Sequence, residues 1–133
     1  MTIAHSYGVL FGTSESSGVT IANNASNLSS EVDLFGADTF TGEINLFLVF
    51  TSTVTAGTMD VSLFGSRGTT LEYTNLIPLV GSYSPISGTQ KIQVNPPWSR
   101  LPVSRYVKGQ VLNNATGASA TNVFLGYELW LYS

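Results

Sequence analysis

Apolar and polar residues alternate along most of this chain with a period of two. In the segment 59–63, Met59, Val61 and Leu63 fall on one side and the residues between them are polar. This alternation is typical of β-strands that bury one face. No segment shows a convincing helical period, and no strand–helix–strand spacing occurs, so a parallel α/β sheet is not expected. The same alternation recurs in the segments 91–95, 105–111 and 122–132.

The segment 43–51 differs because both of its faces are apolar. Four large apolar residues alternate along one face, and Phe47 and Val49 occupy the other. A strand with two apolar faces is typical of the middle of a sheet. We therefore predict that this segment is central and covered on both sides.

Shorter strands and turns complete the prediction. Eight or nine short strands at this spacing indicate one all-β domain over residues 1–133, an antiparallel β-sandwich of jelly-roll type. Residues 1–30 supply a Ser/Asn-rich arm and the first strands. Weaker strands are expected at Tyr7–Phe11, Gly18–Ala22, Val32–Phe35 and Leu71–Leu76, and turns at 13–17, 23–27, 55–57, 66–69, 81–88, 95–97 and 113–119. The expected core residues are Ile44, Leu46, Leu48, Val61, Leu63, Val107, Leu125 and Leu129.

Composition excludes several partners. Charged residues make up 10% of the chain, against about 25% in a typical domain. The net charge is -3 with five basic residues, so we expect no nucleic-acid partner. No apolar run is long enough to span a membrane, and the first seven residues lack the pattern of a secretory signal. A domain with so few solvating charges usually hides surface in an assembly, so we predict a homo-oligomer.

The sequence offers little for catalysis or metal binding. It has no cysteine and one histidine, His5, which we interpret as polar surface. The acidic residues are scattered; Glu31 and Asp33 fit a solvated strand face, and Glu128 fits a cross-strand ion pair with a residue such as Lys108. We therefore predict no enzymatic activity, no cofactor and no metal site.

Two groups of aromatic residues are candidates for contact with another chain. After a double proline, Trp98 is expected in a rigid loop, with Arg100 two residues later. This tryptophan either caps one end of the core or acts with Arg100 as an interface anchor. On the last strand, Phe124, Trp130 and Tyr132 fall opposite the aliphatic residues and need cover. Trp98, Arg100, Phe124, Trp130 and Tyr132 are therefore the candidate interface residues.

The order of these features resembles a known family. An apolar strand at 44–51 leads to a Thr/Gly hairpin and the strand 60–66, and later the strand entry Arg105-Tyr106-Val107 follows a proline-containing loop. From about residue 31 to 132 the chain resembles the small capsid cement, or decoration, proteins of tailed bacteriophages, notably the Bordetella-phage type. Trp98 after the double proline and the long N-terminal third depart from that pattern.

The resemblance implies a function without catalysis. It implies a structural virion protein that oligomerises on the outer surface of the phage head. There it would bind the major capsid protein and stabilise the shell by bridging capsid subunits. Two alternatives remain open: a subunit of a tail or fibre, and a carbohydrate-binding module that stacks sugars on Trp98, Tyr83 and Tyr106.

Overall fold

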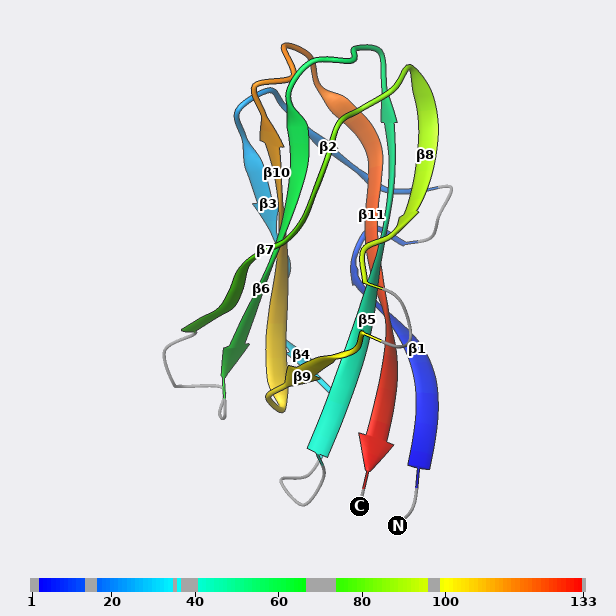
Figure 1. Ribbon diagram of the computed structural model, residues 1–133, viewed down its shortest axis with the longest axis vertical. Helices are drawn as coiled ribbons and strands as arrows, with labels where there is room; N and C mark the ends of the chain where they lie inside the picture. The colour runs from blue at the N-terminus through cyan, green and yellow to red at the C-terminus, as the bar shows by residue number, and fades with distance from the viewer. Residues whose placement is uncertain are drawn as a thin grey trace.

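The computed structural model describes residues 3–13, 17–34, 36, 41–66, 74–95 and 99–132. Every regular element in these ranges is a β-strand, and the strands form two antiparallel sheets that pack face to face (Figure 1). The predicted all-β sandwich is confirmed.

The larger sheet has the strand order β1–β11–β5–β8, and two short strands extend it. β2 continues the line of β1 along β11, and β9 continues the line of β8 along β5. In Figure 1, β5, β11 and β1 lie side by side at the end of the molecule that carries both chain termini. The strands are β1 (Ile3–Phe11), β2 (Val19–Ile21), β5 (Thr41–Ser52), β8 (Gly88–Gln93), β9 (Leu101–Val103) and β11 (Ala120–Tyr132).

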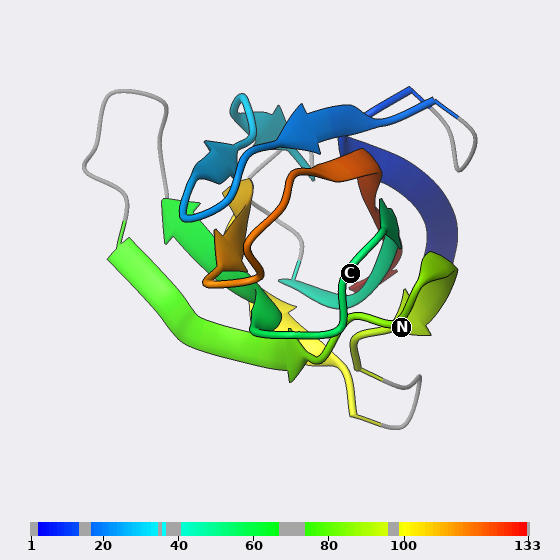
Figure 2. The ribbon, with the colours of Figure 1, turned by 90° about the horizontal axis from the view of Figure 1, so that it is seen from above.

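The smaller sheet has the order β3–β10–β6–β7, with β4 paired to β10 beyond β3. Seen from above, the two sheets enclose the interior of the molecule (Figure 2). The strands are β3 (Ser26–Leu28), β4 (Val32–Asp33), β6 (Thr58–Ser66), β7 (Thr74–Tyr83) and β10 (Tyr106–Asn114).

The core lies between the sheets, where the period-two pattern placed it. All eight predicted core residues are buried, with at most 3% of their surface exposed. Gly109 of β10 packs directly against the larger sheet, because a Cβ there would lie 2.6 Å from Leu10 and Leu125 side-chain atoms. Other buried members of this core include Phe50, Met59, Val111 and Val123.

Asn95 forms the hydrogen bonds of a missing edge strand in the larger sheet. It lies after β8 and before β9, where the edge of β5 that faces away from β11 has no partner strand. Its side-chain oxygen accepts a hydrogen bond from the Leu46 N–H (2.8 Å), and its side-chain nitrogen donates to the Ile44 carbonyl (3.1 Å). The same nitrogen donates to the Ser99 carbonyl (2.9 Å) and so holds the chain that leads into β9. One carboxamide thus replaces the missing strand.

Ser29 repairs a similar gap in the smaller sheet, between β3 and β4 on the edge of β10. Its backbone N–H donates to the Gly109 carbonyl (2.8 Å), and its hydroxyl oxygen accepts from the Gly109 N–H (2.9 Å). Ser29 therefore behaves as a one-residue strand.

Several expectations about the elements need correction. The turns predicted at 66–69 and 113–119 start too early, because Ser66 belongs to β6 and Asn113 and Asn114 belong to β10. The predicted turn at 81–88 starts too early, because β7 extends to Tyr83 and the ring of Tyr83 lies over Gly81, where a Cβ would be 2.1 Å from its hydroxyl. Part of the predicted turn at 23–27 belongs to β3. β9 was not predicted because it contains Pro102, which an edge strand tolerates. Phe35 and residues 71–73, at the ends of two weaker predicted strands, lie outside the described residues.

Candidate functional site

The outer face of the larger sheet carries a cluster of aromatic and charged side chains near the end of β11. Strand register places Trp130 of β11 opposite His5 of β1 and opposite Glu43 of β5. Residues directly opposite each other share one face of a sheet. Arg100, just before β9, and Tyr132 join them. We call these five residues the stacked cluster.

Trp130 lies at the centre of the stacked cluster. The His5 ring stacks on it, with the ring centroids 4.8 Å apart and the planes 21° apart. The Arg100 guanidinium carbon lies over the indole ring, 4.0 Å from its centroid. A cation in this position attracts the electron-rich face of the ring. Neighbours from two other segments therefore hold the indole in one orientation.

Polar contacts fix Arg100 in turn. Its Nη1 donates a hydrogen bond to the Tyr132 hydroxyl (2.6 Å) and lies 3.9 Å from a Glu43 carboxylate oxygen. The hydrogen bond between the phenol and the Glu43 carboxylate raises the pKa of Tyr132 above its usual value, and the nearby Arg100 charge opposes this shift. The phenol is therefore neutral at physiological pH.

His5 connects the stacked cluster to the middle of the face. Its Nε2 lies 2.9 Å from a carboxylate oxygen of Glu128, and the Tyr7 ring meets its ring edge-on at 5.0 Å. The sequence suggested Lys108 as a partner for Glu128. That was wrong, because Lys108 is on β10 of the other sheet, opposite Phe64.

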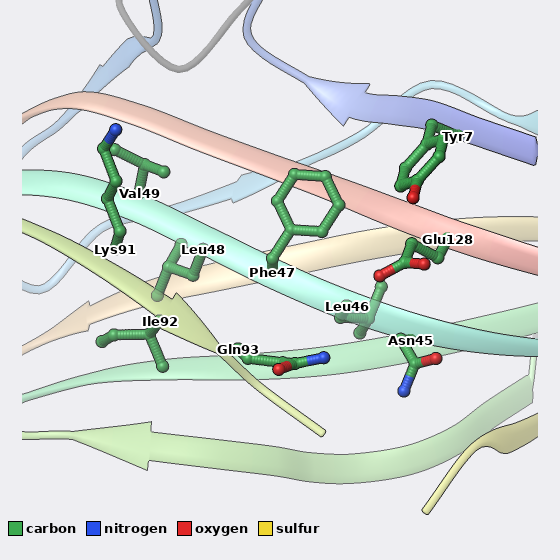
Figure 3. Close-up of a pocket in the computed structure, with 10 residues that line it drawn as sticks. All are labelled: Tyr7, Asn45, Leu46, Phe47, Leu48, Val49, Lys91, Ile92, Gln93 and Glu128. Carbon is green, nitrogen blue, oxygen red and sulfur yellow. The ribbon is translucent and has the colours of Figure 1, made fainter. Parts of the chain in front are cut away.

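Beside Glu128 the face is hollowed into a groove of about 400 Å³ (Figure 3). The Phe47 ring stands at its centre, with the Tyr7 hydroxyl directed toward Glu128 at one end and Lys91 at the other. Gly126 makes this arrangement possible, because a Cβ there would lie 2.4 Å from the Phe47 ring. Side chains from four strands line the groove: Tyr7, Asn45, Phe47, Val49, Lys91, Gln93 and Glu128.

The structure brings three of the five candidate interface residues together, namely Arg100, Trp130 and Tyr132. Phe124 lies on the same face, as expected, but only 4% of its surface is exposed. Its ring packs beside Phe47, and the backbone near Gly12 covers it. It therefore belongs to the fold rather than to an accessible contact surface. Trp98 lies outside the described residues.

Other sequence candidates do not form a site in the described ranges. Tyr83 donates to the Val94 carbonyl, whereas Tyr106 lies near the other end of the smaller sheet beneath the Arg105 guanidinium. Asp33, which was expected on a solvated strand face, binds Arg105 through two contacts of 3.0 Å. Among the residues described, no group of acidic or histidine side chains could hold a metal ion, and no helix could cross a membrane.

The sequence missed two members of the stacked cluster, His5 and Glu43, and most of the groove. Both residues occupy ordinary polar positions of alternating strands. Only the register that pairs β11 with β1 and β5 shows that they flank Trp130. A local pattern holds no such signal, because it does not specify which strands are neighbours.

Comparisons with known proteins support the fold. No family model and no curated protein matches the chain. A solved structure of infectious bursal disease virus, Gt strain, matches with a TM-score of 0.50 and 9% identity over 96% of this chain. The VP2 protein of that virus, in derived T=1 particles, matches with a TM-score of 0.48 and 10% identity over 97% of the chain. A mitogen from Yersinia pseudotuberculosis matches with 0.37 and 14% identity over 98%.

This chain spans about a third of the length of the viral chains, 33% and 31% in the two cases, and 84% of the mitogen. At 9% identity the likeness to the Gt-strain structure describes the architecture alone.

Proposed function

We propose that this chain is a structural virion protein, a cement or decoration protein on the outer surface of a phage head. In this role it binds the major capsid protein, bridges capsid subunits and acts without catalysis. The family resemblance, the sandwich shared with a viral protein at a TM-score of 0.50 and the low charge of the chain all support the proposal.

The observation that carries the proposal is the stacked cluster. Trp, Tyr and Arg are the side chains that most often dominate the binding energy of protein interfaces. Here Arg100 and His5 already hold Trp130, and Tyr132 holds Arg100. Side chains that are fixed before binding lose little further entropy when a partner covers them. The cluster therefore suits a rigid contact with a large flat partner.

A protein that binds the assembled shell but not its free subunits stabilises the shell in proportion to its occupancy. Each copy needs to contribute only a few kcal/mol, because many copies act on one particle. A homo-oligomer engages several capsid subunits at once, and its linked contacts strengthen attachment without any new surface.

The test compares particles with and without the protein in thermal and osmotic rupture. We expect bare particles to rupture under milder conditions, and added wild-type protein to restore resistance. Trp130→Ala should lose attachment. Tyr106→Ala is a matched control, because Arg105 covers the Tyr106 ring on the opposite sheet in the same way. Equal rupture thresholds, or location of the protein in the tail by electron microscopy, would refute the proposal.

The groove favours a second function, binding of a neutral saccharide. Phe47 lies over Gly126, so its ring is a flat platform of the kind that stacks on the C–H face of a sugar. Around it, Gln93, Glu128 and Lys91 offer an amide, a carboxylate and an ammonium group to hydroxyls. These groove residues replace Trp98, Tyr83 and Tyr106, which the sequence suggested as the residues that stack on sugars.

A glycan-binding screen tests this second function. We expect Phe47→Ala to abolish any signal from the groove, whereas Trp130→Ala, outside the groove lining, should retain it. A screen without a hit, or a hit that survives Phe47→Ala, would exclude the groove as a saccharide site.

A further inference from the structure

The outer edge of β1 has no neighbouring strand among the described residues. β1 lies at the end of the strand order of the larger sheet and along the margin of the molecule in Figure 1. Its nine residues include no Lys, Arg, Asp, Glu or Pro, the residues that most often protect an edge strand from pairing. Tyr7 and Val9 are 69% and 39% exposed.

Hydrogen bonds at the opposite edge of the sheet show which way each backbone group points. In an antiparallel sheet the N–H and C=O of one residue point to the same side, and the side alternates along the strand. The Leu46 carbonyl accepts from the Val94 N–H, so Leu46 faces β8. Its neighbours Asn45 and Phe47 consequently face β11.

The direction can be followed across β11 to β1. Asn45 is opposite Glu128, so the backbone groups of Glu128 face β5 and those of its neighbour Leu129 face β1. Leu129 is opposite Ser6 in regular register. Ser6 therefore bonds to β11, and Tyr7, next to it, directs its N–H and C=O away from the sheet. The same alternation applies along the strand and adds His5 and Val9 to the outward set.

We propose that this edge pairs antiparallel with β1 of a second copy, around a two-fold axis at Tyr7. Tyr7 then meets Tyr7 of the partner subunit, and His5 meets Val9 of the partner subunit. Each of these residue pairs exchanges two backbone hydrogen bonds, and the larger sheets of both copies become one continuous sheet. The irregular register between Val9 and Phe11 limits the pairing at that end.

A second copy fits this edge better than an unrelated strand. The edge carries no acidic or basic pair that would select a charged partner, and its arrangement is self-complementary under a two-fold rotation. Such symmetry is the commonest among homo-oligomers. Cross-strand aromatic pairs also stabilise a sheet, and the axis brings the two Tyr7 rings together on the outer face. This dimer does not depend on capsid binding.

Proline substitution tests the pairing, because proline removes one N–H and leaves the side of the strand that faces β11 intact. We expect wild type to sediment as a concentration-dependent dimer and Tyr7→Pro as a monomer. Gln93→Pro is the matched control: Gln93 is on the other edge of the same sheet with its N–H also directed outward. That variant should remain dimeric. A thermal melt of each variant checks that it is folded.

Amide exchange on the unmodified protein provides a second readout. Exchange at the His5, Tyr7 and Val9 amides should slow about tenfold or more when the protein concentration is raised through the dimerisation range. Strictly monomeric behaviour, a dimer that survives Tyr7→Pro, or rapid exchange at these amides in the dimer would overturn the proposal. Pairing with a strand of another protein at this edge, without self-association, would overturn it too.

Discussion

Asn95 and Ser29 have the same structural role at opposite edges of the sandwich. Each lies between two short edge strands and forms hydrogen bonds to the backbone of the inner strand, β5 or β10, where that strand would otherwise have no partner. Their burial is almost equal, with 6% and 5% of their surfaces exposed. The difference is in how many groups depend on each side chain. Asn95 serves two backbone groups of β5 and the Ser99 carbonyl, whereas the Ser29 side chain serves one N–H of β10 and the carbonyl of its exposed neighbour Ser30.

Two side chains that are equally buried can therefore contribute differently to stability. The free energy lost on truncation depends on how many buried polar groups are left without partners. Asn95 also links the edge to the candidate site, because it holds Ser99 next to Arg100. Ser29 has no comparable link to the stacked cluster in the described ranges.

Truncation of Asn95 should have the largest effect. We expect Asn95→Ala to reduce the free energy of unfolding by about 3 kcal/mol, because it leaves the Leu46 N–H and the Ile44 carbonyl of a buried strand without hydrogen-bond partners. Chemical denaturation measures this loss. The variant should also bind particles more weakly, since the segment that carries Arg100 loses an anchor. A loss no larger than that of an exposed asparagine would show that water replaces the carboxamide.

Truncation of Ser29 should cost less. We expect Ser29→Ala to reduce the free energy of unfolding by about 1.5 kcal/mol, because the Gly109 N–H is the one buried group that loses its partner. The Ser30 carbonyl, to which the Ser29 hydroxyl donates, belongs to an exposed residue that water can reach. Particle attachment should be unchanged. If Ser29→Ala destabilises the protein as much as Asn95→Ala in the same denaturation series, the inferred difference between the two side chains is wrong.

The smallest effect is expected for the coupling energy between the two substitutions, measured in the double variant. The two residues are on different sheets and share no hydrogen-bond partner among the described contacts. We therefore expect the losses of the single variants to add within about 0.5 kcal/mol. A larger coupling energy in the double-mutant cycle would show that the two edges unfold as one unit.

The sequence was a good guide to the core and a poor guide to these edges. The alternating positions of β6, such as Val61 and Leu63, follow from the period of a strand alone, and the structure buries them. Asn95 was predicted as part of a turn. Its role as a substitute strand depends on the position of β5, which is about fifty residues away in the chain. Local composition does not contain that information.

The candidate site was predictable in residue type but not in arrangement. Trp130 and Tyr132 were identified because large aromatics opposite a core face need cover. Arg100 was identified because it follows Trp98 by two residues, and tryptophan and arginine are common interface anchors. Their convergence, and the addition of His5, follow from strand register. Phe124 was indistinguishable from Trp130 in sequence, yet neighbouring backbone covers it. The alternating pattern shows on which face of a strand a residue lies. It does not show which other segments cover that face.

The place of β11 in the larger sheet also bears on how the protein is made. β11, residues 120–132, is the strand to which both β1 and β5 pair. During synthesis these two strands leave the ribosome well before β11 exists, and β5 is apolar on both faces. A nascent chain that has not reached residue 120 therefore exposes two strands with no central partner. Such intermediates are prone to aggregate, and their long-range pairings form slowly. We expect accumulation of this protein in cells to be limited by how quickly the last strand follows the first.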